Sequence, residues 1–545
     1  MARLPEDVSA YAGRWVALVS GRVAGVGYTA NEALRLARRN RPKARISLRY
    51  VEPAGGEALQ LSSMLERIEP VLLQQEMPVY LVGGAVRDAL LGELNYDLDF
   101  VVPEGAVGLA FRVADALGVP AYVLDRERDI GRVVLPDEGT MLDFARIRGA
   151  DLVADLRDRD FTLNAMALPA GARSSASLID PCGGQADLAA RHLRLTHPAA
   201  IADDPVRALR AIRMALRFAC QFIEETRQAV RAGADHLGQI SPERLRDELV
   251  KLLQTGQPDQ AVTEMADLGL LPVLLPEVAA LAGVAQSPPH HEAVLPHTAQ
   301  LLRWLVRLEA WLVDGRPVDD PAGAQAQALL APYAGALAAH LDRPVDGGLT
   351  GRVLLRLGGL FHDVGKAQTQ LIDPAGRIRF LGHEAVGAQL TGPRLKALHF
   401  SNEACDYVKK IVAGHMRPLL LANERVNLSR RATFRYFRRT GPAGLDICLV
   451  SLADHLATYG GVGDPDAWTR LLDVVAALLH AYFRQHETVV APPPLLDGRD
   501  LVAQLSLKPG PEVGRLLRLL QEAQAAGEIS TAEEALALAR RNSSR

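Results

Sequence analysis

Two aspartates separated by a single leucine, Asp97 and Asp99, lie in the stretch LVGGAVRDALLGELNYDLDF at residues 81–100. In a β-strand, residues two apart point to the same face about 6.5–7 Å from each other, so Leu98 and Phe100 would face the core. Two carboxylates at that separation repel each other unless a cation lies between them, and hard oxygen ligands suit Mg²⁺. The spacing therefore predicts a magnesium site, with two exposed acids on a solvated edge strand as the alternative.

The segment before these aspartates has the pattern of a phosphate-binding turn. The apolar run PVYLV ends at Gly83 and Gly84, and the following AVRDALLG predicts a helix that ends at Gly92. A glycine turn at the start of a helix presents free N–H groups, which suit a phosphate. A tight turn with a purely structural role is the alternative.

The overall composition is that of an ordinary globular protein. At 545 residues the chain has room for three to five domains of roughly 100–200 residues. A net charge of −3 excludes a globally basic nucleic-acid-binding protein but leaves room for local basic patches. No apolar run reaches the roughly 18 residues of a membrane span, and the N-terminus shows no export signal. The chain has no CxxC pair, so a cytoplasmic location is expected, with neither disulfides nor a thiolate zinc site among Cys182, Cys220, Cys405 and Cys448.

The order of the predicted elements indicates an α+β multidomain protein. GRWVALVSGRVAGVGYT predicts two short strands around Ser20 and Gly21, and the helix ANEALRLARRN follows them. Residues 313–350, rich in Ala, Gly, Asp and Pro, indicate an insertion or a long loop. ISTAEEALALARR predicts a helix with a capping box from Ser530 to Glu533. The expected domains are a small accessory α/β module (1–56), joined by a linker at 53–58 to an α/β head (57–182), then a helical neck (183–270), a helical body (271–484) and a helical tail (485–545).

Five motifs in chain order resemble those of the nucleotidyltransferase superfamily, in particular its bacterial class II branch of tRNA CCA-adding enzymes and related poly(A) polymerases. The first is GGAVRD together with the two aspartates. The family's RDFT-x-NA motif is matched by Arg159, Asp160, Phe161, Thr162 and Asn164. LIDPCGGQADL at 178–188 matches D-P-x-G-G-x-x-D-L, and ISPERLRDELVKLL at 240–253 matches a later helix. Between these two, DDPVRALRAIRMALRF at 203–218 matches E-D-P-x-R-x-L-R-x-x-R, with Asp203 where glutamate is usual.

This resemblance implies template-independent addition of CMP and/or AMP, from CTP or ATP, to tRNA 3′ ends by two-metal phosphoryl transfer. Asp97 and Asp99 would be the catalytic Mg²⁺ ligands of the head. Asp143, in MLDFARIR, would be a third carboxylate unless it is a strand-end acid paired with Arg146 or Arg148. The residues implied in nucleotide binding are Gly83, Gly84, Arg87, Asp88, Arg159, Asp160, Asn164, Asp204, Arg207 and Arg210.

Base choice is implied to depend on the DDPVRALRAIR motif. Asp204, Arg207 and Arg210 fall at i, i+3 and i+6, near one face of a helix. In the family, the acid and the first arginine present hydrogen-bonding edges to the incoming base; a surface ion pair is the alternative. Only GADLVADLRD separates Arg148 from Arg159 here. Full CCA-adding members have a longer charged segment there that helps to switch from CTP to ATP. CC addition, A addition, full CCA addition and poly(A) synthesis are all left open.

A second set of residues resembles the HD superfamily of metal-dependent phosphohydrolases. The set comprises His297, His362, Asp363, His383, His415 and Asp454. The resemblance implies a site for a divalent metal, either Mg²⁺, Mn²⁺ or a transition metal, on helices of an α-bundle. It also implies hydrolysis of phosphomonoesters or 2′,3′-cyclic phosphates at RNA ends, which makes an HD phosphohydrolase an alternative function for the whole chain.

The stretch RVNLSRRATFRYFRRTG carries six arginines between residues 425 and 439. We expect RNA contacts from Arg430, Arg431, Arg435, Arg438 and Arg439, with the interleaved aromatic residues either stacking on bases or packing inside the protein. A solvated basic helix face is the alternative. The tail after the HD region is implied to contact tRNA. No membrane partner is expected, and the sequence does not give the oligomeric state.

Overall fold

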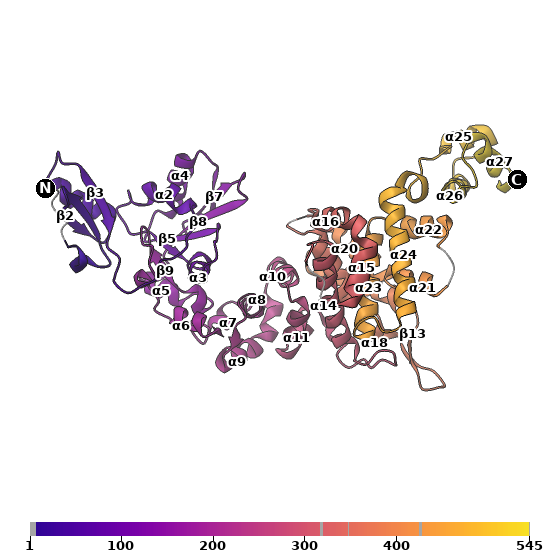
Figure 1. Cartoon of the computed structure of the whole chain (residues 1–545), viewed down its shortest axis with the longest axis horizontal. Helices are drawn as coiled ribbons and strands as arrows, with labels where there is room; N and C mark the ends of the chain where they lie inside the picture. Colours follow the sequence, from indigo (N-terminus) through magenta and orange to yellow (C-terminus); the bar gives the residue numbers. More distant parts are fainter. Residues whose placement is uncertain (1–6, 317–319, 347, 425–427, 544–545) are drawn as a thin grey trace. The chain divides into compact units, whose positions relative to one another are not determined.

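The structure is a computed structural model, which describes residues 7–316, 320–346, 348–424 and 428–543. Arg425, one of the six arginines noted above, lies outside the described residues. The chain forms two compact units, Met1–Gly233 and Ala234–Arg545. The first combines sheets with helices, and the second is almost entirely helical, so the predicted α+β fold class is confirmed (Figure 1).

The first unit begins with a small module in which one helix packs on a three-stranded sheet of order β2-β1-β3. Its elements are β1 (Trp15–Val19), β2 (Arg22–Gly27), α1 (Ala30–Asn40) and β3 (Ile46–Tyr50). The predicted hairpin and helix are confirmed, whereas β3 was not predicted. Small residues let α1 approach the sheet closely. A Cβ on Gly25 would lie 2.2 Å from the Ala33 carbonyl oxygen, so this position requires glycine.

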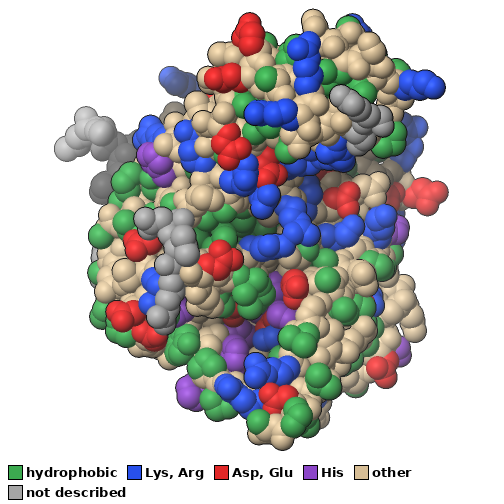
Figure 2. All heavy atoms as spheres, turned by 90° about the vertical axis from the view of Figure 1, so that its right-hand side faces the viewer, with side chains coloured by type: hydrophobic (Ala, Val, Ile, Leu, Met, Phe, Trp, Pro, Cys, Tyr) green, Lys and Arg blue, Asp and Glu red, His purple; other side chains and the backbone are tan. Residues whose placement is uncertain are grey.

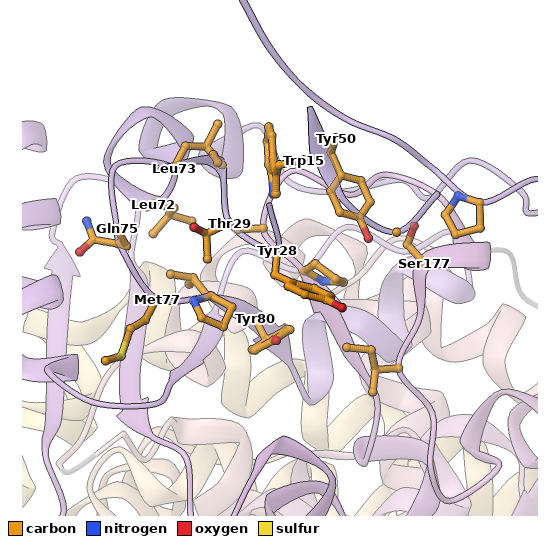
Figure 3. Close-up of a pocket in the computed structure, with 18 of the residues that line it drawn as sticks. Trp15, Tyr28, Thr29, Tyr50, Leu72, Leu73, Gln75, Met77, Tyr80 and Ser177 are labelled. Atoms are coloured by element: carbon orange, nitrogen blue, oxygen red, sulfur yellow. The ribbon is translucent and has the colours of Figure 1, made fainter. Parts of the chain in front are cut away.

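A cavity of about 280 Å³ lies where this module meets the head, within the first unit. Figure 3 shows the rings of Trp15, Tyr28, Tyr50 and Tyr80 around it. The connecting segment is fixed to the head, because the Ser175 N–H donates to the Glu57 carbonyl oxygen at 2.8 Å. The module and the head therefore share a packed junction.

A six-stranded sheet of order β6-β7-β8-β5-β4-β9 forms the centre of the head. Its strands are β4 (Tyr80–Val82), β5 (Leu98–Val102), β6 (Ala121–Asp125), β7 (Ile130–Leu135), β8 (Thr140–Arg146) and β9 (Ala167–Pro169). β5 and β8 run parallel, and the other neighbours are antiparallel. One face is covered by α2 (Met64–Leu72) and α4 (Ala106–Leu117), and the other by α5 (Leu152–Arg157). With both faces covered, the chemistry must lie at an end of the strands.

The remaining helices and short strands of the first unit include a long amphipathic helix, α8. They are α3 (Gly84–Leu90), α6 (Gly184–Ala189), β10 (His192–Leu193), α7 (Ala200–Asp203), α8 (Arg207–Phe218), β11 (Gln221–Phe222) and α9 (Glu224–Ala232). The buried face of α8 carries Ala208, Leu209, Ala211 and Ile212. Arg207, Arg210 and Arg217 of this helix contact the motif residues described below.

The second unit contains eighteen α-helices among its described residues, and one short hairpin. They are α10 (Pro242–Gln254), α11 (Pro258–Asp267), α12 (Leu271–Leu274), α13 (Pro276–Ala279), α14 (Val294–Leu312), α15 (Pro321–Leu330), α16 (Ala334–Asp342), α17 (Gly351–Phe361), α18 (Lys366–Thr369), β12 (Gln370–Ile372), β13 (Ile378–Phe380), α19 (His383–Ala397), α20 (Asn402–Gly414), α21 (Arg417–Asn423), α22 (Arg430–Thr440), α23 (Ala443–Tyr459), α24 (Pro465–Arg484), α25 (Gly498–Leu505), α26 (Pro511–Ala526) and α27 (Ala532–Asn542). None of the described helices is long and apolar enough to cross a membrane.

Two details of the second unit differ from the sequence analysis. Residues 313–350 were predicted as an insertion or a long loop, but they contain α15 and α16. Asp320 caps α15 and Pro321 occupies its first turn, so the Asp-Pro pair starts a helix that the alanines continue. The predicted capping box from Ser530 to Glu533 is off by one residue. Thr531 and Glu534 form it instead, since the STAEE sequence offers the same spacing twice.

Candidate active site of the head and metal centre of the helical unit

Asp97 and Asp99 lie at the start of β5, as the alternation of the strand predicts. Leu98 and Phe100 are 2% and 1% exposed, respectively, and point into the core, whereas both aspartates are exposed. Asp97 directly precedes the strand, and its Oδ1 accepts the Met141 N–H at 3.1 Å. The edge-strand alternative is wrong, because β5 is an interior strand between β8 and β4.

Asp143 joins these two carboxylates. It sits opposite Asp99 in the register of the parallel strands β8 and β5. Arg132 of β7 holds it through two hydrogen bonds of 2.7 Å, one to each carboxylate oxygen. Asp143 is therefore ion-paired, as the alternative predicted, but its partner is Arg132 and not Arg146 or Arg148. Sequence reasoning missed Arg132. Its contact with Asp143 depends on the pairing of β7 with β8, which the sequence does not show.

The protein groups around Asp99 disfavour its ionised form. Crowding by surrounding protein, followed by the negative charge of Asp143, raises the pKa of Asp99 to about 6, against the opposing charges of Arg159 and Arg132. A bound cation would remove this penalty, so the donor set fits Mg²⁺. Among the described residues of the head, no three ligand atoms already gather within 4.8 Å of one another. This agrees with Mg²⁺ sites that use one or two carboxylates and leave the remaining positions to water and phosphate.

Gly83 brings the backbone close to these carboxylates. Its φ of +72° lies in the left-handed region that favours glycine. A Cβ there would lie 3.3 Å from Arg159 Nη1 and 3.6 Å from Asp99 Oδ2. Asp155, which the sequence analysis did not single out, positions Arg159 through a contact of 3.1 Å. The structure thus brings Gly83, Asp99 and Arg159 together, as a phosphate and its metal would require.

Other predicted nucleotide-binding residues form a chain of hydrogen bonds. Arg210 donates to Asp160 at 3.0 Å, and Asn164 donates to Asp160 at 3.0 Å and accepts from Arg87 at 2.5 Å. Arg87 also donates to Asp88 at 2.6 and 2.8 Å and stacks on Phe218. Because Arg87 is only 4% exposed, its side chain holds α3 to α8. A role of Arg87 at the phosphate stays a prediction.

The chain of hydrogen bonds also sets the charge of Asp160. Burial alone would raise the pKa of Asp160, but the Arg210 guanidinium and the Asn164 amide together hold that pKa below its ordinary value. Asp160 therefore stays ionised. Two further residues of this network, Asn95 and Arg217, contact Asp88 and were not predicted.

The helix that carries Arg207 and Arg210 does not include Asp204. Asp204 has an extended backbone (φ −149°, ψ 91°), and α8 begins at Arg207, so the expected placement of all three residues on one helical face is wrong. The reason is Pro205, since a residue before proline is disfavoured in the helical conformation. Arg207 donates to the carbonyl oxygens of Arg159, Ala200 and Asp158, at 3.1–3.4 Å.

In the second unit, the six HD residues converge from α14, α19, α23 and the ends of α17 and α20. They form two groups whose ligand atoms all lie within 4.8 Å: His297, His362 and Asp454 in one, and Asp363, His383 and His415 in the other. The two oxygens of Asp363 connect the groups. Oδ2 lies 3.0 Å from His362 Nε2, and Oδ1 lies 3.3 Å from His383 Nε2. This arrangement suits two cations bridged by one carboxylate.

Backbone contacts orient the imidazoles for metal binding. Nδ1 of His362, His383 and His415 lies 2.7–2.8 Å from a carbonyl oxygen three residues earlier in each case, which places the proton on Nδ1. In the neutral form of each ring, Nε2 then carries a lone pair and faces the cluster. For His362, burial opposes protonation, but the neighbouring Asp363 carboxylate raises the pKa of the ring above its ordinary value. Burial, with the nearby His362 and His383, lowers the pKa of His415 to about 3, so this ring is neutral. Two Nε2 atoms, of His383 and His415, lie only 3.2 Å apart. A cation between such lone pairs resolves the contact, so the residues fit a metal.

A cavity of about 400 Å³ opens beside this cluster. Its lining includes Asp363, Lys366, Arg377, Arg379 and Tyr459. Lys366 Nζ lies 2.7 Å from Asp363 Oδ2. The two arginines come from β13 and the turn before it and were not predicted, because nothing in the sequence places that hairpin at the metal cluster. The positive lining suits a phosphate ester.

The arginine-rich helix α22 has buried aromatic residues, and its arginines are partly engaged in contacts and partly exposed. Phe434, Tyr436 and Phe437 are buried, so the packing alternative holds for the aromatic residues. Arg431 and Arg435 form ion pairs of 2.7 and 2.5 Å with Glu528 and Glu522, next to the tail helix α26. Arg430 donates to two carbonyl oxygens, those of Ala525 and Thr488. Arg438 and Arg439 are exposed.

Positive charge gathers on this part of the second unit. Figure 2 shows Lys and Arg side chains around a hollow in the face that it views. A cavity of about 340 Å³ is lined by four arginines, Arg417, Arg431, Arg435 and Arg439. Arg430, Arg431 and Arg435 therefore contact the tail, whereas Arg438 and Arg439 face solvent.

Four family models match the chain. The "Poly A polymerase head domain" matches residues 79–194, and the "Probable RNA and SrmB- binding site of polymerase A" matches 221–281. The "HD domain" matches 330–459, and a model described as "tRNA nucleotidyltransferase domain 2" matches 469–539. The matches follow the order of the motifs predicted from the sequence.

Characterised relatives extend over most of the chain. The chain is 35% identical over 470 residues to an A-adding tRNA nucleotidyltransferase of Deinococcus radiodurans, covering 85% of this chain and 94% of the relative. It is 33% identical over 469 residues to a CC-adding tRNA nucleotidyltransferase of Thermus thermophilus, covering 84% and 92%. A solved complex of a CCA-adding enzyme with ATP shares the fold, with a TM-score of 0.57 at 20% identity, covering 89% of this chain and 99% of that one. The chain therefore belongs to the bacterial tRNA nucleotidyltransferase family, whose head and HD domains it contains.

Proposed function

We propose that this enzyme adds CMP or AMP, from CTP or ATP, to tRNA 3′ ends, in a partial reaction that stops after one or two nucleotides. The observation that carries the proposal is the approach of Asp97, Asp99, Gly83 and Arg159 at one end of the head sheet. Carboxylates for Mg²⁺, an arginine and a glycine backbone at one point are what a nucleoside triphosphate requires. The proposal places the enzyme in the cytoplasm, where its four free cysteines stay reduced.

Asp97 and Asp99 would hold Mg²⁺, which when bound lowers the pKa of the RNA 3′-hydroxyl and offsets charge at the departing pyrophosphate. Arg132 holds both oxygens of Asp143, the carboxylate opposite Asp99 in the strand register, and so fixes the orientation of that side chain. Arg159 presents Nη1 beside Gly83, where it would contact a phosphate oxygen. Asp155 fixes the other end of that guanidinium, so little side-chain freedom is lost when the nucleotide binds.

Base recognition would fall to Asp204 and Arg207, which lie at the start of α8. An aspartate accepts from an exocyclic amino group, and an arginine donates to ring acceptors. The connection that would switch between bases is short, because β8 ends at Arg146 and α5 begins at Leu152. This brevity supports partial addition, either CC or A, over complete CCA synthesis.

Nucleotide incorporation tests the proposal. tRNA transcripts that end before, within or after CC would be incubated with CTP, ATP or both. We expect one base to be used on one class of end, with product length stopping at one or two nucleotides. Synthesis of complete CCA would contradict the partial reaction, long A tracts would identify a poly(A) polymerase, and no incorporation on any transcript would remove the proposal.

A second activity is favoured by the bridged metal cluster and its basic cavity, namely hydrolysis of phosphates at RNA ends. Two candidate cations beside Lys366 and Arg377 suit a phosphomonoester or a 2′,3′-cyclic phosphate. Release of phosphate from a 3′-phosphorylated tRNA should survive Asp97→Asn but be lost in Asp363→Asn. Equal loss in both variants, or no release by the unaltered enzyme with Mn²⁺ or Mg²⁺, would contradict a hydrolytic HD site.

A further inference from the structure

The N-terminal module differs in charge from the rest of the chain. Residues 1–56 contain ten Lys and Arg against four Asp and Glu, whereas the whole chain has 61 against 64. The first family model begins at residue 79 and assigns nothing to this module. A small basic module on a chain of near-neutral charge requires its own explanation.

Six of these basic residues fall between residues 35 and 45 and are together called the basic strip: Arg35, Arg38, Arg39, Arg41, Lys43 and Arg45. The first three lie at i, i+3 and i+4 on α1, on the face opposite Ala33 and Ala37, which pack on the sheet. The other three follow in the connection between α1 and β3. All six side chains are exposed, and no acid interrupts residues 35–45.

The acids of the module do not neutralise the basic strip. Glu32 accepts the Tyr28 N–H at 2.9 Å, and Glu52 accepts from the Arg173 N–H and the Ser177 hydroxyl. Among the described residues, none of the six basic side chains has a carboxylate within 4 Å. Arginines of the head, by contrast, form ion pairs with aspartates, as Arg132 and Arg159 do. Six like charges without acidic partners repel one another unless an anion lies over them.

Helix stability explains only part of this pattern. Arg38 and Arg39 occupy the last turn of α1, where positive charge interacts favourably with the helix dipole. Arg41, Lys43 and Arg45 lie beyond the helix and gain nothing from it. Long, exposed cations along a helix face and the adjoining connection can contact several backbone phosphates at once.

We propose that the basic strip binds the phosphate backbone of RNA. The identification of this RNA as tRNA rests on the proposed function, whereas the proposal that the basic strip binds RNA does not. Contacts of this kind add affinity and rate of encounter without reading sequence. The basic strip would therefore hold the body of the RNA while the head acts on its 3′ end.

Binding of a fluorescently labelled tRNA transcript that lacks CCA tests this inference in the full chain. One variant would neutralise four charges at once (Arg38→Gln, Arg41→Gln, Lys43→Gln and Arg45→Gln). A matched control would keep the charge (Arg38→Lys, Arg41→Lys and Arg45→Lys). Anisotropy titrations at about 50 and 200 mM KCl give the Kd and its dependence on salt.

We expect the neutral variant to raise the Kd roughly tenfold and to reduce the slope of log K against log salt by about two or more. The control should stay within about twofold of the unaltered protein, because Lys and Arg serve a phosphate backbone alike. KM for tRNA should rise in the neutral variant while kcat at saturating tRNA is unchanged. Thermal melting checks that both variants are folded.

An unchanged Kd and salt slope in the folded neutral variant would overturn the inference, as would an equal loss in the charge-retaining control. Loss of binding to phosphatidylglycerol vesicles with unaltered tRNA binding would assign the basic strip to a membrane surface and likewise overturn it. The outcome is separable from the proposed function. If the enzyme incorporates no nucleotide but the neutral variant loses RNA affinity, the proposed function fails and the inference about the basic strip stands. If the enzyme incorporates nucleotides but the neutral variant keeps its RNA affinity, only the inference about the basic strip fails.

Discussion

Asp143 lies opposite Asp99 in neighbouring parallel strands, and both oxygens of its carboxylate are held by Arg132 at 2.7 Å. The pair places two carboxylates at one end of the sheet, with Arg132 bound to Asp143 and the positive charge of Arg159 also acting on Asp99. Arg132 thus restrains Asp143 without neutralising Asp99, whose charge is left for a cation. The proposed metal binding at Asp99 therefore depends on the ion pair between Arg132 and Asp143, which lies outside the sequence motifs.

The first prediction concerns Asp99→Asn. We expect nucleotide transfer to fall at least about 100-fold, because a neutral amide is a poor Mg²⁺ ligand. The fold should persist, since Asp99 is exposed and accepts no hydrogen bond that holds the sheet. Incorporation kinetics with a preferred tRNA end, alongside circular dichroism, provide the measurement. Transfer at the unaltered rate would mean that Mg²⁺ is held elsewhere.

The second prediction is that Mg²⁺ binding depends on pH through Asp99. Crowding and the Asp143 charge raise its pKa to about 6, so below that pH a proton competes with the metal. Affinity should fall up to about tenfold per pH unit below 6 and level off above 7. In the metal-free protein the sign of the effect on stability is opposite: as pH rises from about 4 to about 6, ionising Asp99 costs stability, because the folded state binds its proton more tightly.

Calorimetric titration of Mg²⁺ between pH 5 and 8 would follow this dependence (the range brackets the pKa of about 6). Asp99→Asn provides the control, because its weaker binding should not vary with pH through that carboxyl. An affinity that is constant across the range would contradict the raised pKa.

The third prediction concerns Arg132 as a positioning residue. Arg132→Gln removes a positive charge that lowers the pKa of Asp99, so the midpoint of the Mg²⁺ titration should move to higher pH. Loss of the contact to Asp143 should also reduce kcat roughly tenfold. Arg132→Lys keeps the charge but not the two-point contact, so it should restore the midpoint more than the rate. A pH midpoint that does not move in Arg132→Gln would rule out this electrostatic role.

Much of the head could be predicted from short-range patterns. Alternation in NYDLDFVV gave the outward direction of Asp97 and Asp99 because it depends only on strand geometry. The position of Asp143 opposite Asp99 could not be predicted, since it depends on which strands become neighbours across some forty residues of chain. Asp204 shows the reverse case. The following Pro205 disfavours a helical conformation at Asp204, but the i, i+3, i+6 spacing was given more weight in predicting a helix there.

In the second unit, the histidine motif predicted that the six candidate metal ligands lie together, but not what surrounds them. Spacing within FHDVGK is local, whereas Arg377 and Arg379 reach the cavity only through the β12–β13 hairpin. The helices within 313–350 were missed because composition rich in Ala, Gly and Pro was read as loop, although Asp320 and Pro321 signal a helix start.

The fourth prediction concerns the ion pair between Asp160 and Arg210. Asp160→Asn should lower the free energy of unfolding by about 2 kcal/mol, because it leaves a half-buried guanidinium without its carboxylate. The pKa of Asp160 is held low in the fold, so this stabilisation is present above about pH 4 and is lost as pH falls through the folded pKa. Urea unfolding at neutral pH measures the difference. The exposed Asp158→Asn is the matched control and should cost under about 1 kcal/mol.

The fifth prediction is that metal removal destabilises the helical unit. Asp363 bridges two groups of ligands whose imidazole lone pairs face one another, so a bound cation should stabilise the fold by about 2.7 kcal/mol at a concentration one hundred times its Kd. Chelation by EDTA should therefore lower the melting temperature, and Mn²⁺ or another divalent ion should restore it. In His383→Ala the response to chelation should shrink, whereas the exposed His399→Ala should behave as the unaltered protein. Identical melting with and without the chelator would show that the cluster holds no metal of consequence for the fold.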